Sequence, residues 1–400
     1  MPNSGFDSDI ATYSAWAQRL FDLGPGSFYS ADYFADYPPG YLYVLWLGSH
    51  LVAFVNGGTI EGTADMLKLG PIVADVAVAA VLFLLVRRWT KTRADSVRLS
   101  LVAAGLYLFN PVTWYDSAVW GQTDAVGALI ILLGVAALIR GNSEGATAMA
   151  AVALLVKPQF GVVLIPIVAI VLLRRHLLVP GSGPRNKVLL PGPIGAWLER
   201  EQGVWRLVSS AVIGLGLLVL LLLPFNLDIV EFVALIVQTA GGYPWLSVNA
   251  YNLWALIGAG GTDPLAFGGY WSSDTVPLLG PLPGVAIGTF LLVAGFLAGL
   301  ARLAWRSDRR SILVVTAFLA LAFFVLPTRV HERYLFPVFA VLPLLAVFDR
   351  RWLWATIALS IAAFINLHGV LTTPLYATPN LETLPLGELF RQPIGIITSA

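Results

Sequence analysis

Long apolar runs separated by short polar segments make up most of this 400-residue chain. A run of about 20 apolar residues is typical of a transmembrane helix, because a helix of that length crosses the hydrocarbon core of a bilayer. The pattern predicts ten such helices, several of them shorter than a straight span needs, over residues 68–86, 97–115, 124–139, 146–156, 160–173, 206–223, 284–303, 311–327, 334–348 and 352–367. A further short helix is expected at residues 228–238.

The composition agrees with a membrane protein. Hydrophobic residues make up 58% of the chain, charged residues 12%, and the mean hydropathy is +0.78. We therefore predict an all-α, polytopic transmembrane helix bundle that forms one domain over residues 1–400. The absence of cysteine excludes disulfides, thiolate-bound zinc and thiol catalysis in this chain, and the net charge of +1 indicates no nucleic-acid partner.

Lysine and arginine are concentrated on one set of alternate loops. Of the 24 in the chain, 18 fall within residues 87–98, 140–144, 174–206, 302–310 and 349–351. The positive-inside rule predicts that these loops face the cytoplasm. The outward side then carries a first loop over residues 1–66 and a later loop over residues 224–283. A short chain without extra domains suits the bacterial plasma membrane.

Residues 40–55 form one more apolar run, which we expect to lie in the outer membrane interface or to be re-entrant. If this run crossed the membrane, the basic residues at 87–93 would face outward, against the positive-inside rule. The start of the chain then lies outside with no apolar helix before it. We therefore expect a first transmembrane helix to be missing from this sequence.

Five polar clusters fall on the predicted outward side. Asp7 and Asp9 stand at the start of an amphipathic helix, and DYPPGYLY follows at residues 36–43. YDSAVWGQTD at 115–124 and VKPQF at 156–160 lie at helix junctions. The fifth cluster, RVHERY at 329–334, places four polar or charged side chains between two apolar runs, where charge is costly.

Each cluster also has a simpler interpretation when it is taken alone. Asp7, Asp9 and Asp124 suit helix N-caps, Lys157 is long enough to extend to the lipid headgroups, and arginine is common at the ends of transmembrane helices. Five clusters on one face, however, favour a single outward-facing cavity of carboxylates, cations and aromatic rings. A carboxylate can take the proton of an incoming hydroxyl while cations stabilise a departing phosphate. The four histidines have no metal-ligand spacing, so neither a metal nor a cofactor is predicted.

The motifs DYPP (36–39), NPVTWYDSAVWGQTDAVGAL (110–129), VKPQ (156–159) and VHERY (330–334) occur in an order that resembles the GT-C superfamily of membrane glycosyltransferases. The likeness is to the dolichyl-phosphate-glucose glucosyltransferases and their bacterial mannosyltransferase-like relatives. It implies a GT-C-like fold and an inverting transfer of a sugar from a polyprenyl-phosphate donor. The acceptor would be a hydroxyl of a glycan, lipid or protein on the outer face.

The resemblance also implies an acidic general base in the first outer loop. We expect this base to be Asp9, which immediately precedes the amphipathic helix, with Asp7 as the alternative. The donor phosphate is expected at Arg329, His331, Arg333, Lys157 and Gln159. The sugar and acceptor pocket is expected at Asp36, Tyr37, Trp120, Gln122, Asp124, Glu332 and Tyr334. Two other functions stay open: a transporter or flippase for a lipid-linked or polar substrate, and a non-catalytic subunit in envelope assembly.

Overall fold

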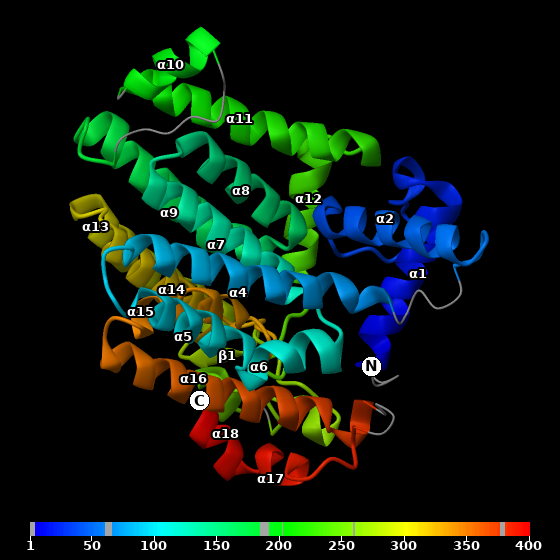
Figure 1. Ribbon diagram of the computed structural model, residues 1–400. Coiled ribbons are helices and arrows are strands. Elements are labelled where there is room, and N and C mark those ends of the chain that lie inside the picture. Colours follow the sequence, from blue (N-terminus) through cyan, green and yellow to red (C-terminus); the bar gives the residue numbers. More distant parts are fainter. Residues whose placement is uncertain (1–4, 61–65, 185–191, 202, 259–260, 377–380) are drawn as a thin grey trace.

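The chain is described here by a computed structural model that covers residues 5–60, 66–184, 192–201, 203–258, 261–376 and 381–400 (Figure 1). Parts of the predicted first outer loop, residues 1–4 and 61–65, lie outside the described residues. The N-terminal part contains α1 (Asp7–Leu23), α2 (Pro39–Val55), α4 (Leu69–Trp89), α5 (Ser96–Leu108), α6 (Pro111–Trp114), α7 (Asp124–Arg140), α8 (Ser143–Val156), α9 (Pro158–Leu173), α10 (Gly192–Arg200), α11 (Val204–Leu222) and α12 (Ile229–Gly241). The C-terminal part contains β1 (Pro277–Leu279), β2 (Leu282–Pro283), α13 (Gly284–Trp305), α14 (Arg309–Val325), α15 (Leu342–Ala346), α16 (Arg350–Leu371), α17 (Gly387–Arg391) and α18 (Pro393–Ser399).

The predicted all-α membrane fold is confirmed. Each of the ten predicted apolar runs contains a helix, and the only strands among the described residues form one short antiparallel hairpin, β1 with β2. In the described parts of the chain, five helical stretches are long and apolar enough to cross a membrane: Leu69–Trp89, Pro158–Leu178, Val204–Phe225, Gly284–Trp305 and Arg350–Leu371. Other helices are shorter. The helix α8 has 14 residues, in agreement with its short apolar run, whereas the 19-residue run at 97–115 is broken at Phe109 and Asn110 into α5 and α6.

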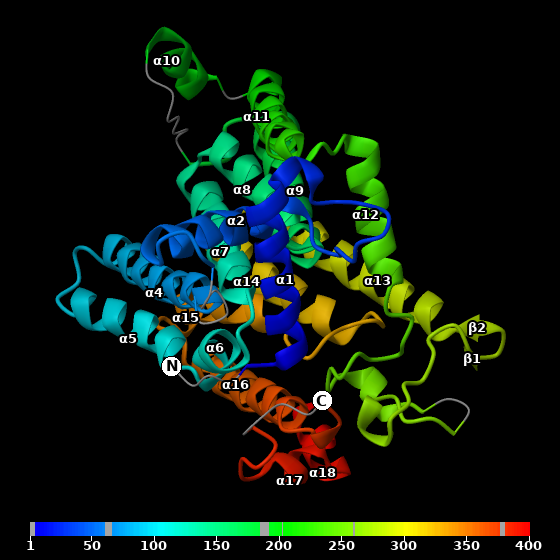
Figure 2. The same cartoon turned by 90° about the vertical axis from the view of Figure 1, so that its right-hand side faces the viewer.

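The long helices lie side by side, and α1 runs across one end of them. In Figure 1 the long helices extend across the picture and α1 stands upright at their right-hand end. Figure 2, viewed from that end, shows α1 in front of the bundle. This helix is amphipathic, because Tyr13, Trp16 and Leu20 are buried on one face while its other face is exposed. The amphipathic helix expected to follow Asp9 is therefore present.

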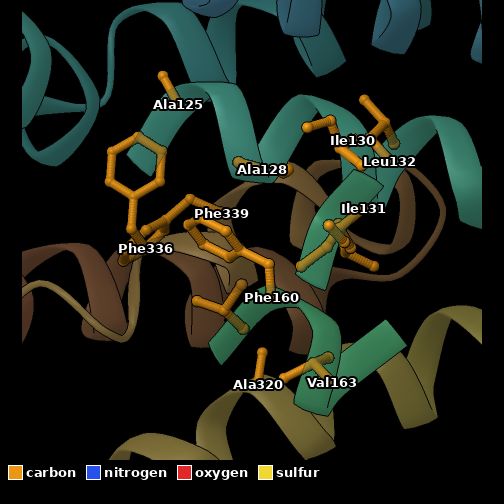
Figure 3. Close-up of a cluster of buried hydrophobic side chains, with 14 of the residues drawn as sticks. Ala125, Ala128, Ile130, Ile131, Leu132, Phe160, Val163, Ala320, Phe336 and Phe339 are labelled. Atoms are coloured by element: carbon orange, nitrogen blue, oxygen red, sulfur yellow. The ribbon is translucent and has the colours of Figure 1, made fainter. Parts of the chain in front are cut away.

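The helix α7 lies at the centre of the bundle, where it packs against α4, α8 and α9. Phe160 of α9 is fully buried and lies over Gly127, so that a β-carbon at position 127 would meet its ring at 1.9 Å. Figure 3 shows Phe160 among Ala128, Phe336 and Phe339. Glycine at position 127 is what allows two membrane helices to approach this closely.

The helix α2 begins at Pro39 and packs against α1, α8 and α11. Proline suits the first turn of a helix, because its missing N–H would have no partner there. The interfacial or re-entrant position of α2 stays a prediction. The apolar pattern did predict α12, but it did not predict α10, α17 or α18, which are short and less apolar.

Candidate functional site

A cavity of about 430 Å³ opens where α1, the 34–37 segment, the start of α9, α12 and the 327–334 segment meet. We call it the α1 cavity. Nine of the predicted site residues line it: Asp9, Asp36, Tyr37, Lys157, Gln159, Arg329, His331, Arg333 and Tyr334. Four of the five polar clusters therefore reach one cavity, although up to about 300 residues of chain separate them. The remaining cluster, YDSAVWGQTD at 115–124, does not line the cavity but contacts it through Trp120 and Gln122, which both bind Asp9.

Asp9 lies in the first turn of α1, and its side chain contacts the YDSAVWGQTD cluster. Its Oδ2 accepts hydrogen bonds from Trp120 Nε1 at 2.8 Å and from Gln122 Nε2 at 2.5 Å. The N-cap interpretation of Asp7 and Asp9 is wrong, because the N-cap residue of α1 is Phe6 and no side chain forms a cap hydrogen bond there. Asp7 is exposed and is not among the residues that line the α1 cavity.

Lys157 lies in the bend between α8 and α9, which Pro158 begins. Its side chain is only 3% exposed, and Nζ lies 3.2 Å from both Asp124 Oδ2 and Gln122 Oε1. The interpretation of Lys157 as a residue that extends to the headgroups is therefore wrong. The N-cap interpretation of Asp124 is also wrong, because Thr123 occupies the cap position and the buried Asp124 carboxylate pairs with Lys157.

Arg333 is the second cation of the α1 cavity. Its Nη1 donates to Glu332 Oε1 at 2.5 Å, and its Nε lies 3.9 Å from Asp124 Oδ2. Burial alone would lower the pKa of Arg333, but the surrounding carboxylates, Glu332 first, raise it above its ordinary value. Burial raises the pKa of Glu332, and Arg333 opposes that shift. Lys157 and Arg333 thus line the cavity, while the carboxylates that pair with them, Asp124 and Glu332, do not.

His331 does not supply a further positive charge at neutral pH. Burial, with Arg333 and Lys157 nearby, holds the pKa of His331 well below its usual range. Its ring packs edge-on to Tyr243 at 5.0 Å and lies 5.2 Å from the ring of Tyr334. His331 therefore contributes a neutral ring with hydrogen-bonding nitrogens.

Arg329 forms an ion pair with Asp274, away from Lys157 and Arg333. Its Nε lies 2.7 Å and its Nη2 3.2 Å from the two carboxylate oxygens of the fully buried Asp274. Arg329 has a φ of +65°, a strained conformation for a residue other than glycine, which this two-point ion pair helps to hold. The pair connects Asp274 to the site. With the hydrogen bond from Nη1 to the Ala240 carbonyl at 3.2 Å, all three guanidinium nitrogens of Arg329 are engaged, whereas one nitrogen of Arg333 is hydrogen-bonded among the described residues.

Several residues of the site were not predicted, among them Tyr13, Tyr243 and Asp274. Tyr13 OH lies 2.8 Å from Tyr37 OH and donates to Gln122 Oε1 at 3.1 Å. Tyr243 lines the α1 cavity, and Asp274 positions Arg329. The amphipathic pattern of α1 places Tyr13 on its buried face, but no pattern around Tyr243 or Asp274 marks either of them.

A comparison with protein families gives the decisive finding. The family described as "PIG-U: GPI transamidase subunit PIG-U" matches residues 23–256, which is more than half of the chain. The chain belongs to the PIG-U family. No curated protein matches it in sequence. The match includes the DYPP, WGQTD and VKPQF clusters, whereas Asp9 and the RVHERY cluster lie outside it.

Membership of the PIG-U family corrects the predicted function. The prediction of a polyprenyl-phosphate-sugar-dependent glycosyltransferase, and of a mannosyltransferase-like activity, is wrong, because the family is a subunit of a GPI transamidase. The family fits better the alternative of a non-catalytic subunit. Short polar motifs at helix junctions reveal where a membrane fold encloses a cavity, but they do not reveal which reaction, if any, takes place there.

The predictions of a multi-pass membrane protein and of the bilayer as a partner are confirmed by the apolar helices and by the PIG-U family. A polyprenyl-phosphate sugar as its ligand is not supported. The bacterial plasma membrane and the outward orientation of the α1 cavity stay predictions.

Proposed function

We propose that this chain is a non-catalytic membrane subunit of a GPI transamidase type of assembly. In this proposal the α1 cavity holds the headgroup of a glycosylated phosphatidylinositol while a protein partner carries out the reaction. The observation that carries the proposal is that one cavity combines two cations that keep free donors, Lys157 and Arg333, with several aromatic rings and an apolar wall. A glycolipid with a phosphate, sugars and acyl chains presents the complementary surfaces.

The two cations suit the phosphate. Lys157 and Arg333 both line the α1 cavity. Among the described residues, Lys157 Nζ uses two of its three hydrogens in hydrogen bonds and Arg333 uses one of its guanidinium nitrogens, so both keep donors available. Asp124 and Glu332 orient the two side chains from behind. Charge-assisted hydrogen bonds from lysine and arginine to phosphate are among the strongest polar contacts in proteins. Pre-positioned cations also reduce the entropy lost on binding.

The aromatic and acidic residues suit a sugar. Tyr13, Trp16, Tyr37 and Tyr243 all line the α1 cavity, and aromatic faces pack against the apolar faces of sugar rings. Asp36 also lines the cavity, and burial raises the pKa of its carboxyl group. Carboxyl and phenol oxygens are acceptors for sugar hydroxyls in either protonation state of the carboxyl group.

The apolar wall suits the lipid. Val162 of α9, Ile236 of α12 and Phe323 of α14 line the same cavity. The stretch Pro158–Leu178 that contains Val162 is long enough to cross the membrane, so the cavity meets the bilayer region along this wall. An acyl chain would therefore leave the cavity along α9 and α12 while the headgroup stays with the cations.

The proposal is tested by equilibrium binding of a glycosylated phosphatidylinositol, fluorescently labelled on one acyl chain, to the full chain in detergent micelles. Lys157→Gln and Arg333→Gln should each raise the Kd about tenfold or more, since one hydrogen bond to a charged group contributes about 1.5–3 kcal/mol. Lys91→Gln removes an exposed charge distant from the site and should leave the Kd unchanged. Equal affinities in all four proteins would overturn the proposal.

A further inference from the structure

A second pocket, of about 740 Å³, lies at the end of the bundle away from α1. It is formed where α4, α7, α9 and α13 end and α14 begins, on the left in Figure 1. We call it the arginine pocket after the side chains that line it: Arg174, Arg175, Arg306, Arg309 and Arg310, together with Trp89. None of these residues belongs to the α1 cavity, so the pocket is a separate feature of the molecule.

Positive charge in the arginine pocket is only partly compensated. Of its described lining residues, Asp308 alone is acidic, and this carboxylate pairs with Arg306 and caps α14. Asp349 lies 3.3 Å from Arg310. In the part of the chain that the structure describes, Arg174, Arg175 and Arg309 have no carboxylate within 4.0 Å. Three guanidinium groups therefore share a pocket without an acidic partner.

Arg175 is the most informative of the three, because its side chain is buried at 5% exposure. Nη1 donates to the Leu138 carbonyl at 2.7 Å and Nη2 to the Ser307 carbonyl at 3.1 Å, and both acceptors are neutral. The buried Nε has no hydrogen-bond partner among the described residues. A buried charge is costly unless an opposite charge accompanies it. The pocket thus presents an unpaired buried cation to whatever enters it.

The other two arginines are pre-positioned by neutral groups. Arg174 donates to Ser182 Oγ at 2.7 Å and to the Ala304 carbonyl at 3.0 Å. Arg309 lies over the ring of Trp89, 4.5 Å from its centroid. These contacts orient the guanidinium groups and leave their charge uncompensated, which is the arrangement that favours binding of a phosphate group.

The surroundings of the arginine pocket point to a lipid as the source of that phosphate. The pocket lies at the end of membrane-spanning stretches, where headgroups are found. Beside it, Leu173, Leu177 and Trp305 are exposed by 40%, 51% and 81%, which gives acyl chains an apolar surface next to the cations. Basic pockets between transmembrane helices are a known means of binding anionic lipid headgroups.

We propose that the arginine pocket binds the phosphate headgroup of an anionic phospholipid. The proposal does not depend on a ligand in the α1 cavity, since the two sites share no residues. A bound headgroup would supply the missing counter-charge to Arg175 and would connect α9, α13 and α14 at this end of the bundle.

The test is native mass spectrometry of the full chain in detergent, titrated with phosphatidylglycerol or with phosphatidylcholine. The wild-type chain should retain one phosphatidylglycerol at least tenfold more tightly than phosphatidylcholine. Arg175→Gln and Arg309→Gln should each reduce this preference about tenfold. Arg309 is exposed, so its variant tests the pocket even if Arg175→Gln fails to fold. Arg140→Gln removes an exposed basic charge outside the pocket and should keep the preference.

Three results would overturn the proposal. The first is an unchanged preference in Arg309→Gln, and the second is an equal loss in Arg140→Gln, which would indicate general electrostatics. The third is binding of soluble glycerol phosphate as tightly as phosphatidylglycerol, which would identify a soluble phosphate ester as the ligand. A preference that persists at high salt in the wild type and is lost only in the two pocket variants would support the proposal, because buried ion pairs are screened weakly.

Discussion

The buried Asp124 carboxylate gives the sharpest prediction about stability. It is fully buried, and its Oδ2 lies 3.2 Å from Lys157 Nζ and 3.9 Å from Arg333 Nε. At an effective dielectric constant of about 20, these distances correspond to roughly 5 and 4 kcal/mol of attraction before desolvation is counted. Asp124→Asn leaves the buried Lys157 without its carboxylate partner and removes one of the two carboxylates near Arg333, which keeps Glu332. We expect it to lower the free energy of unfolding by about 3–5 kcal/mol.

The assay is a double-mutant cycle with Lys157→Met, measured by denaturant unfolding of the full chain in detergent micelles. Since the two residues are in contact, their effects should deviate from additivity by about 0.5–3 kcal/mol, with the double variant more stable than the sum predicts. Asp95→Asn breaks the exposed Arg93–Asp95 pair and should leave stability unchanged within error. Additive effects at positions 124 and 157 would refute the assignment of a coupled buried pair.

Two further predictions concern His331 and Gly127. Because the pKa of His331 is lowered in the folded state, the unfolded state binds a proton at His331 more readily. The free energy of unfolding therefore falls as the pH drops below about 6.5, by at most about 1.4 kcal/mol per pH unit. The melting temperature of His331→Gln should vary less between pH 7.5 and 5.5 than that of the wild type, and parallel curves for the two proteins would contradict this. Gly127→Ala places a methyl group against the ring of Phe160 and should lower the free energy of unfolding, measured by thermal unfolding, by about 1–3 kcal/mol. Gly216→Ala in α11 is the control: its added methyl group meets open space, so it should be neutral or stabilising. Equal effects of the two substitutions would contradict the close approach of Gly127 to Phe160.

The hydrophobic pattern was sufficient for most of the helices. Each predicted apolar run contains a helix, because burial in lipid requires every backbone hydrogen bond to be made within the segment. The pattern did not predict α17 and α18, because they are short helices that pack on α16 after the last apolar run. Packing against a neighbour, rather than hydropathy, accounts for such elements.

The polar clusters predicted which segments meet, but not how their charges pair. RVHERY suggested three basic groups for one anion, whereas the structure pairs Arg329 with Asp274 and surrounds His331 with aromatic rings. Asp274 lies 55 residues before Arg329, and no local pattern connects positions so far apart. The function was predicted wrongly because the residue types at the site do not specify one function. A cavity with cations and carboxylates suits binding as well as catalysis, and it was the family match that contradicted the predicted glycosyltransferase.

The most direct test of the proposed function is photo-crosslinking with a glycosylated phosphatidylinositol that carries a photoreactive group on its sugar. The account predicts adducts on the two segments that line the α1 cavity, residues 8–16 and 327–334, and their loss in Lys157→Gln and Arg333→Gln. A phosphatidylinositol without the sugar, with its photoreactive group on the inositol, should label the same segments more weakly. Adducts confined to other parts of the chain, or undiminished in both variants, would contradict the claim that this cavity holds the glycolipid headgroup.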